Sequence, residues 1–115
     1  SGNKGRVGVI DKAMLFDNNE RLQVTQSASI NNLNQVSISV WAYATAAGGG
    51  RLFYKDGEFA LYSTPSSGDV NFQGRGWSGS MGVWRSGDDI LKEEQFNHIV
   101  ITYDMVATAN DPVLY

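Results

Sequence analysis

Apolar side chains recur at every second position along most of this chain. The clearest stretch is residues 36–43, where aliphatic side chains alternate with serine and aromatic side chains. A period of two sets the aliphatic residues on one face of a β-strand, and these residue types favour strands. Shorter segments with the same alternation are 21–24, 59–62, 70–73 and 99–102. The sequence therefore predicts an all-β fold and gives little support to helices.

Turn-forming residues separate the expected strands. The Asn-rich residues 17–20 predict a hairpin between residues 13–16 and 21–24, because Asn tolerates left-handed backbone conformations. Asp56 and Gly57 predict a second hairpin. Further turn segments lie at 47–50, 65–69, 86–89 and 110–112, and residues 90–96 are expected to form a loop rather than a helix. This spacing gives roughly seven to nine short strands, which is typical of a sandwich or barrel.

Length and composition limit the functional classes. The 115 residues, of which 42% are hydrophobic and 18% charged, fit one domain over residues 1–115. A net charge of −3 argues against a nucleic-acid partner, which requires clustered Lys and Arg. The absence of cysteine excludes disulfides, thiolate metal sites and cysteine nucleophiles. The apolar stretches fall far short of the roughly 20 residues of a membrane helix, so no membrane insertion is expected.

Three motifs associated with catalysis or cofactors have structural explanations. Residues 74–79 match Gly-x-Gly-x-x-Gly, but the residues that follow alternate like a strand, so we interpret the segment as a flexible loop. The acidic pairs 88–89 and 93–94 fall in turn-like, solvated sequence, unlike the carboxylates of glycosidases. His98, the sole histidine, heads the expected strand 99–103 and is interpreted as structural. The sequence therefore predicts a protein that is not an enzyme.

Aromatic, amide and guanidinium side chains favour binding of a sugar. Sugar rings stack their apolar faces on Trp or Tyr, while Asn, Gln and Arg hydrogen-bond the hydroxyls. Trp77 stands in the glycine-rich segment close to Arg75. The predicted ligand contacts are Trp77, Arg75, Asn71 and Gln73, with Tyr43, Tyr62 and Arg85 as additional candidates. The alternative is that Trp41, Tyr43 and Tyr62 pack inside the sandwich.

Calcium is the remaining ligand whose chemistry the residues suit. It prefers hard oxygen ligands at loop positions, and the predicted set is Asp17, Asn19 and Asp104. A regular Asp-x-Asp-x-Asp-Gly loop is absent, so such a site would be assembled from separate loops. Turn formation alone is the alternative explanation of these residues. No cofactor is required for the predicted function.

Several segments together resemble a known family. Residues 12–17 followed by 22–24 resemble the opening of a laminin-G-like domain of the concanavalin A-like lectin/glucanase superfamily. Residues 36–42 resemble its aromatic strand, and residues 96–104 resemble its Thr-Tyr-Asp segment. Residues 52–55 and 59–62 fall in the expected order. The resemblance implies an antiparallel β-sandwich of the jelly-roll type. It also implies a non-catalytic module that recognises glycans or another extracellular macromolecule.

The chain departs from the family pattern at three points. The usual Trp-His pair is Phe96-Asn97, and the Glu-x-Asp-x-x-Glu strand of the superfamily's glucanases has no counterpart. A strand of the family pattern begins at Val113, and only two residues follow Val113 in this sequence. We therefore expect a C-terminally truncated domain or a fragment of a longer protein. Its open strand edges would then favour self-association or completion by another chain.

The resemblance also implies a biological setting. The expected location is extracellular, at the cell surface or at the virion surface, within a surface, secreted or virion-associated protein. The expected partner is a glycan or an extracellular or surface protein. One alternative is a purely structural or assembly module of a fibre, adhesin or viral particle, and a second is an auxiliary domain of a polysaccharide-degrading enzyme.

Overall fold

The regular secondary structure of the described residues is almost all β-strand. The computed structural model describes residues 5–7, 12–17, 20–45, 49–64, 67–77, 80–107 and 109–115. Within them, each pair of named strands is antiparallel. The chain divides into an N-terminal unit, Ser1–Asn31, and a C-terminal unit, Asn32–Tyr115. The predicted all-β antiparallel fold is confirmed, and the single domain over residues 1–115 stays a prediction.

Within its described residues, the N-terminal unit has one strand pair and one short helix. Strand β1 (Gly5–Val7) pairs with β2 (Lys12–Met14), and the 3-10 helix η1 spans Ala28–Ile30. The predicted strand over residues 21–24 is wrong, because that segment has no regular structure. Its apolar residues are exposed, with Leu22 at 70% and Val24 at 74%.

The turn predicted at residues 17–20 forms, but the hairpin does not. The Glu20 amide donates to the Asp17 carbonyl at 2.9 Å, and the Asp17 amide donates to the Glu20 carboxylate at 2.9 Å. The segment before the turn pairs with β1 instead of with the segment after it. A four-residue alternation with two apolar residues buries too little surface to hold a strand without a ladder partner.

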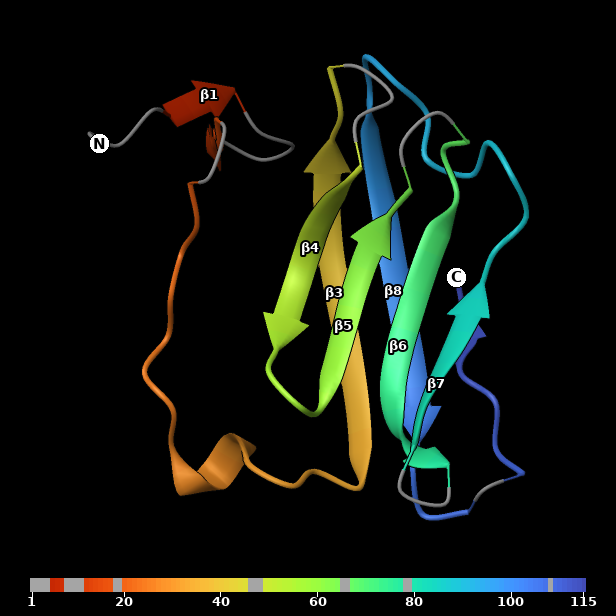
Figure 1. Ribbon diagram of the computed structural model, residues 1–115. Coiled ribbons are helices and arrows are strands. Elements are labelled where there is room, and N and C mark those ends of the chain that lie inside the picture. The colour runs from red at the N-terminus through yellow and green to blue at the C-terminus, as the bar shows by residue number, and fades with distance from the viewer. Residues whose placement is uncertain are drawn as a thin grey trace. The chain divides into compact units, whose positions relative to one another are not determined.

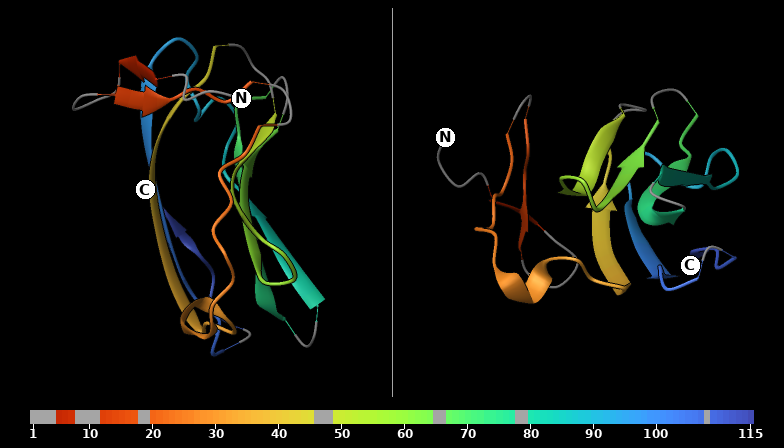
Figure 2. Two further views of the ribbon diagram at one scale, coloured as in Figure 1. Left: turned by 90° about the vertical axis from the view of Figure 1, so that its left-hand side faces the viewer. Right: turned by 60° about the horizontal axis from the view of Figure 1, so that its bottom comes forward.

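The C-terminal unit is a sandwich of two sheets, which Figure 1 and Figure 2 show as two layers. The sheets have the orders β3-β8-β9 and β4-β5-β6-β7. The strands are β3 (Gln35–Tyr43), β4 (Gly50–Lys55), β5 (Phe59–Ser63), β6 (Val70–Trp77), β7 (Ser80–Arg85), β8 (Phe96–Asp104) and β9 (Val113–Leu114). The hairpin predicted at Asp56 and Gly57 is confirmed between β4 and β5, and Gly57 supplies the positive φ of 69° that the turn needs.

The hydrophobic core lies between the two sheets. Ile38 on β3 pairs with Ile101 on β8, and both are buried against the four-stranded sheet. From the opposite sheet, Leu61 and Phe72 are paired across β5 and β6 and are 0% and 1% exposed. Burying each such side chain contributes about 1.5–3 kcal/mol. The alternation read from the sequence is therefore the pattern that fills this core.

Residues 74–77 of the glycine-rich segment form a strand, so the prediction of a flexible loop is wrong for them, while residues 78 and 79 lie outside the described residues. Residues 74–77 continue β6, and Gly74 pairs with Gly82 on β7. A Cβ atom at Gly74 would lie 2.9 Å from the rings of both Phe72 and Tyr103. Glycine is therefore required here by close packing of aromatic rings rather than by backbone flexibility.

Residues 90–95 form the expected loop into β8. The Asn97 side chain fixes this loop by accepting from the Lys92 amide at 2.9 Å and donating to the Lys92 carbonyl at 2.8 Å. A second donation reaches the Gln95 carbonyl at 3.0 Å. Asn97 therefore has a structural role at the position where the family usually has histidine.

Candidate functional site

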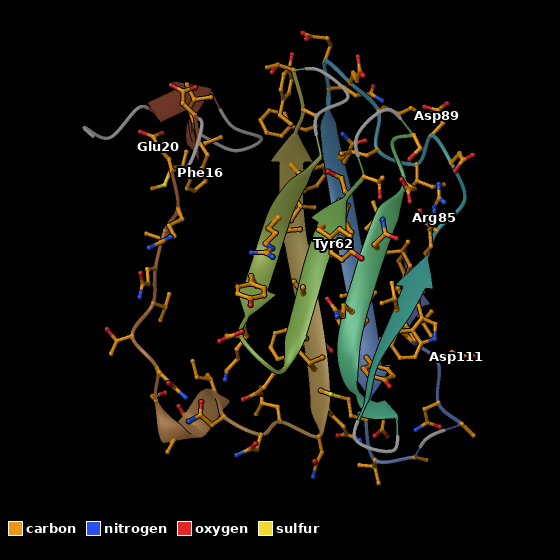
Figure 3. All side chains as sticks on the ribbon, in the orientation of Figure 1. Phe16, Glu20, Tyr62, Arg85, Asp89 and Asp111 are labelled. Atoms are coloured by element: carbon orange, nitrogen blue, oxygen red, sulfur yellow. The ribbon has the colours of Figure 1, made fainter. Side chains whose placement is uncertain are left out.

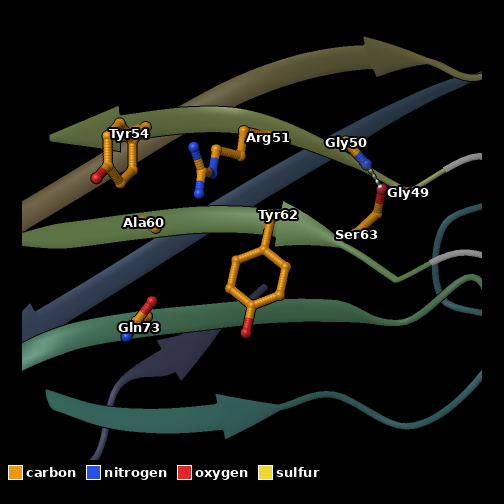
Figure 4. Close-up of a pocket in the computed structure, with 8 residues that line it drawn as sticks. All are labelled: Gly49, Gly50, Arg51, Tyr54, Ala60, Tyr62, Ser63 and Gln73. Carbon is orange, nitrogen blue, oxygen red and sulfur yellow. Dashed lines mark hydrogen bonds between the residues drawn. The ribbon is translucent and has the colours of Figure 1, made fainter. Parts of the chain in front are cut away.

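Side chains from three neighbouring strands line an open groove on the outward face of the four-stranded sheet. Its volume is about 330 Å³, and Figure 4 shows its lining residues. They are Gly49, Gly50, Arg51, Tyr54, Ala60, Tyr62, Ser63 and Gln73. Such a set combines two phenol rings with a guanidinium and a primary amide.

Strand register explains how these side chains meet. Directly paired residues share a face of a sheet, and Tyr54, Ala60 and Gln73 are paired across β4, β5 and β6. The next row across the same face pairs Arg51 with Tyr62. Ala60 is 3% exposed and small, so it forms a low floor between the longer side chains on either side. The groove is thus a consequence of one alanine among large neighbours.

A β-bulge in β4 brings Arg51 onto this face. The register shifts between Arg51, which pairs with Tyr62, and Phe53, which pairs with Leu61. Leu52 is the extra residue, and its side chain packs against the core cluster. Phe53 stacks on the buried Phe59 ring with centroids 5.5 Å apart. Leu52 and Phe53 therefore both take the core side of the sheet, where Phe53 stays 43% exposed on the edge strand, while the residues that flank them both face outward.

The bulge in β4 allows a cation–π contact between two residues of this strand. The Arg51 guanidinium carbon lies 4.3 Å from the centroid of the Tyr54 ring. The Tyr54 hydroxyl donates to the Asp56 carboxylate at 2.6 Å, and this hydrogen bond raises the pKa of Tyr54 above its ordinary value. At the other end of the groove, the Gly50 amide donates to the Ser63 hydroxyl at 3.2 Å. The side chains of Arg51, Tyr54 and Ser63 are thereby held in place before any ligand arrives.

Among the predicted contacts, Gln73 and Tyr62 line the groove, whereas Arg85 and Asn71 lie further across the same sheet. Asn71 pairs with both Tyr62 and Arg85. Asn71 is only 4% exposed, and its amide donates to Thr64 at 2.8 Å and to Asp69 at 3.0 Å. Asn71 therefore lies beneath the surface of the sheet, where its hydrogen bonds stabilise the β5–β6 connection.

Arg85 lies at the end of β7 (Figure 3). It is held there by two carboxylates. Its Nε lies 2.5 Å from Asp69, and its terminal nitrogen lies 2.8 Å from Asp88. Asp69 is fully buried, and a hydrogen bond from the Ser67 hydroxyl is the main cause that lowers the pKa of Asp69 to about 2. The Asn71 amide and the Arg85 charge act in the same direction. This cluster ties the β5–β6 turn to the loop after β7.

Arg75 and Trp77 lie in the last part of β6, where their backbones pair with Met81 and Ser80. Their side chains lie outside the described residues. Tyr43 is on β3 in the other sheet, so the structure does not bring it to the groove.

The alternative that Trp41 and Tyr43 pack inside the sandwich is wrong. Both face outward from β3 and are 51% and 44% exposed. Tyr62 is half-buried, but it too is on an outward face. The inward positions of β3 are taken by the aliphatic set that includes Ile38.

Sequence reasoning missed Arg51 and Tyr54. A signal was present, because the segment Arg-Leu-Phe-Tyr at residues 51–54 breaks the alternation with two adjacent apolar residues between two residues suited to a surface. Such a break is the expected pattern of a bulge. Recognising it would have placed both residues on one face.

The predicted calcium ligands do not form a described group. Asn19 lies outside the described residues, and Asp17 and Asp104 belong to different units. Asp104 accepts from the Val106 amide at 2.9 Å and from Gln35 at 3.0 Å, and these bonds lower its pKa. Over the part of the chain that the structure describes, no group of three or more Asp, Glu or His residues could hold a metal ion. The calcium site stays a prediction.

With the fold and the groove in view, comparison with known proteins decides the family. A laminin-G-type family model, described as the concanavalin A-like lectin/glucanases superfamily, matches residues 16–115. The chain belongs to this superfamily. No curated protein and no solved structure matches it. The predicted resemblance and the β-sandwich are confirmed.

Membership of the superfamily supports a binding role. Laminin-G-like domains are generally non-catalytic modules that bind carbohydrates or other macromolecules, and they are commonly extracellular. No helix within the described residues is long and apolar enough to cross a membrane.

The acidic pair 88–89 is engaged by basic side chains, with Asp88 bound to Arg85 and Asp89 bound to Lys92 at 2.5 Å.

Proposed function

We propose that this chain is a non-catalytic glycan-recognition module that binds a sugar in the groove on β4, β5 and β6. The contacts would be the rings of Tyr54 and Tyr62 with the polar groups of Arg51 and Gln73. Exposed phenol rings stack against the apolar faces of sugars, while guanidinium and amide groups hydrogen-bond the hydroxyls. The groove volume of about 330 Å³ falls at the lower end of the range for small-ligand sites.

The observation that carries this proposal is the bulge-directed position of Arg51. The Arg51 guanidinium contacts the ring of Tyr54. Arg51 is also the cross-strand partner of Tyr62, which bears the second ring. Residues fixed in this way lose little side-chain entropy on binding. A groove that is already ordered therefore suits a flexible, hydroxyl-rich ligand.

Further contacts would come from the β6–β7 side of the same sheet. Gln73 already lines the groove, and β6 continues from it to Arg75 and Trp77. We propose those two residues as contacts for one end of a longer saccharide, and Arg85, in the cross-strand row of Tyr62 and Asn71 at the opposite end of β7, as a contact for its other end. The parent protein would then be secreted, surface-bound or virion-associated, as expected for a recognition module of this superfamily.

The test is a glycan array, followed by calorimetric titration of the best oligosaccharide. Tyr62→Ala should lower the affinity measured in that titration by about tenfold or more, which is the loss expected when a stacking ring is removed. Tyr115→Ala is the matched control, because Tyr115 is 72% exposed and follows β9 in the other sheet. An array without signal, or equal losses in both variants, would overturn the proposal. Running the array with calcium and with a chelator tests whether calcium is needed for binding.

A further inference from the structure

The outward face of β3 and β8 carries aromatic rings where a solvent-exposed sheet usually carries polar residues. Trp41 pairs with His98, and Tyr43 pairs with Phe96, so the four rings lie in two adjacent rows of one face. Trp41 remains 51% exposed and Tyr43 remains 44% exposed. Contiguous exposed rings of this kind mark contact surfaces more often than isolated ones do.

These rings are fixed rather than loose. Trp41 and His98 stack with centroids 4.5 Å apart and an angle of 13°, and the His98 Nε2 is 2.9 Å from the Ser39 hydroxyl. Tyr43 meets Phe96 edge to face at 5.3 Å. Rigid aromatic surfaces bind with a small entropic penalty, because few rotamers are lost.

A carboxylate is held beside the rings. The Tyr43 hydroxyl donates to the Glu94 carboxylate at 3.2 Å. Glu94 has a positive φ of 56°, and its amide donates to the Ala44 carbonyl at 2.8 Å. The backbone of the loop therefore fixes the position of this negative charge at the edge of the aromatic rows.

The charges on this face have one sign. Strands β3, β8 and β9 contain no Lys or Arg. Two carboxylates lie on or beside this face, those of Glu94, bonded to Tyr43, and Asp104, bonded to Gln35. Aromatic faces and carboxylates both attract cations, and together they repel anionic ligands.

From this combination we infer that the β3–β8 face binds a basic peptide segment of a partner protein. An arginine or lysine of that segment would lie against Trp41 and Tyr43, with its charge directed to Glu94. This face and the groove belong to opposite sheets, so the inference is independent of the proposed glycan site. The chain would then join a saccharide on one sheet to a basic protein segment on the other.

The experiment is an NMR titration of the full 115-residue chain with a short peptide of alternating glycine and arginine. The expected result is saturable shifts of the Trp41 indole N–H and of β3 and β8 amides. A peptide with citrulline in place of arginine has nearly the same shape without the charge, and it should bind at least about tenfold more weakly. Raising the salt from about 50 to about 300 mM should weaken binding of the arginine peptide.

Matched variants separate the charge from the rings. Glu94→Gln should weaken arginine-peptide binding by about fivefold, while Glu93→Gln, one residue away, should leave it unchanged. Trp41→Ala should weaken it similarly, and Tyr54→Ala on the other sheet should not. The inference is overturned if the citrulline peptide binds equally well, if neither peptide binds, or if a neutral hexasaccharide shifts the same resonances while the arginine peptide does not. If Trp41→Ala fails to fold, the two glutamate variants decide.

Discussion

The guanidinium of Arg51 lies 4.3 Å from the ring of Tyr54, although three positions separate the two residues along one strand. In a regular strand, residues with this spacing point to opposite faces. The bulge at Leu52 removes that restriction and turns two polar-ended side chains to the same side. The candidate groove therefore depends on one irregularity of backbone pairing.

Tyr54 should ionise above the ordinary pKa of tyrosine. The hydroxyl donates to Asp56, and this bond favours the protonated phenol. Ultraviolet difference titration would detect the shift as part of a late-ionising component, to which Tyr103 also contributes because burial raises its pKa, and Tyr54→Phe should reduce that component. Asp56→Asn should move the ionisation of Tyr54 to lower pH, and a titration unaffected by this change would contradict the assignment.

Gly74→Ala should destabilise the fold by about 1–3 kcal/mol, the usual penalty for overpacking a filled core. The new Cβ would lie 2.9 Å from the rings of Phe72 and Tyr103, which are both buried. Chemical denaturation with urea measures the change. Gly87→Ala is the control, because a Cβ there meets no atom within 4 Å and should alter stability by about 0.5 kcal/mol or less.

Stability should fall in acid partly because of Asp69. Its pKa in the folded chain is lowered to about 2, below the value of about 3.9 for an unfolded aspartate. A lowered folded-state pKa stabilises the protein above the unfolded pKa, and that stabilisation is lost as pH falls from about 4 to about 2. Thermal unfolding across this range should show the loss in the native chain.

Asp69→Asn should be less stable than the native chain at neutral pH, and its stability should depend less steeply on pH between about 4 and about 2. The carboxylate is replaced by a group that cannot accept from Ser67, Asn71 and Arg85 in the same way. The exposed Asp88→Asn serves as the control, since a surface ion pair contributes about 0–1 kcal/mol. Equal acid profiles for native chain and Asp69→Asn would contradict the role given to this residue.

Tyr103→Phe should leave stability unchanged or raise it by about 1 kcal/mol. The Tyr103 hydroxyl is buried and has no hydrogen-bond partner within the described residues. Removing a buried polar atom without a partner eliminates its desolvation penalty while keeping the ring contacts with Phe72 and Trp84. A loss of more than about 1 kcal/mol in urea denaturation would show that the hydroxyl is in fact satisfied.

Local sequence patterns predicted some elements of this fold and missed others. The strand around Ile38 and the hairpin at Gly57 were predicted correctly, because alternation and turn chemistry are local properties. The strand at Leu22 was not, because a strand also needs a partner with free ladder positions. Gly74 was wrongly predicted to lie in a loop. The rings that require a glycine there belong to Phe72 and Tyr103, and Tyr103 is far from Gly74 in the sequence.

By itself, the amino-acid sequence determined an all-β sandwich of the concanavalin A-like superfamily and the inward set of aliphatic residues. Only the tertiary structure decided which outward residues become neighbours. Tyr62 and Gln73 meet Arg51 and Tyr54 through strand pairing and a one-residue bulge, and Trp41 meets His98 across strands separated by more than fifty residues. Alternation fixes which face a side chain takes, whereas its neighbours on that face depend on register, and register is set by the whole sheet.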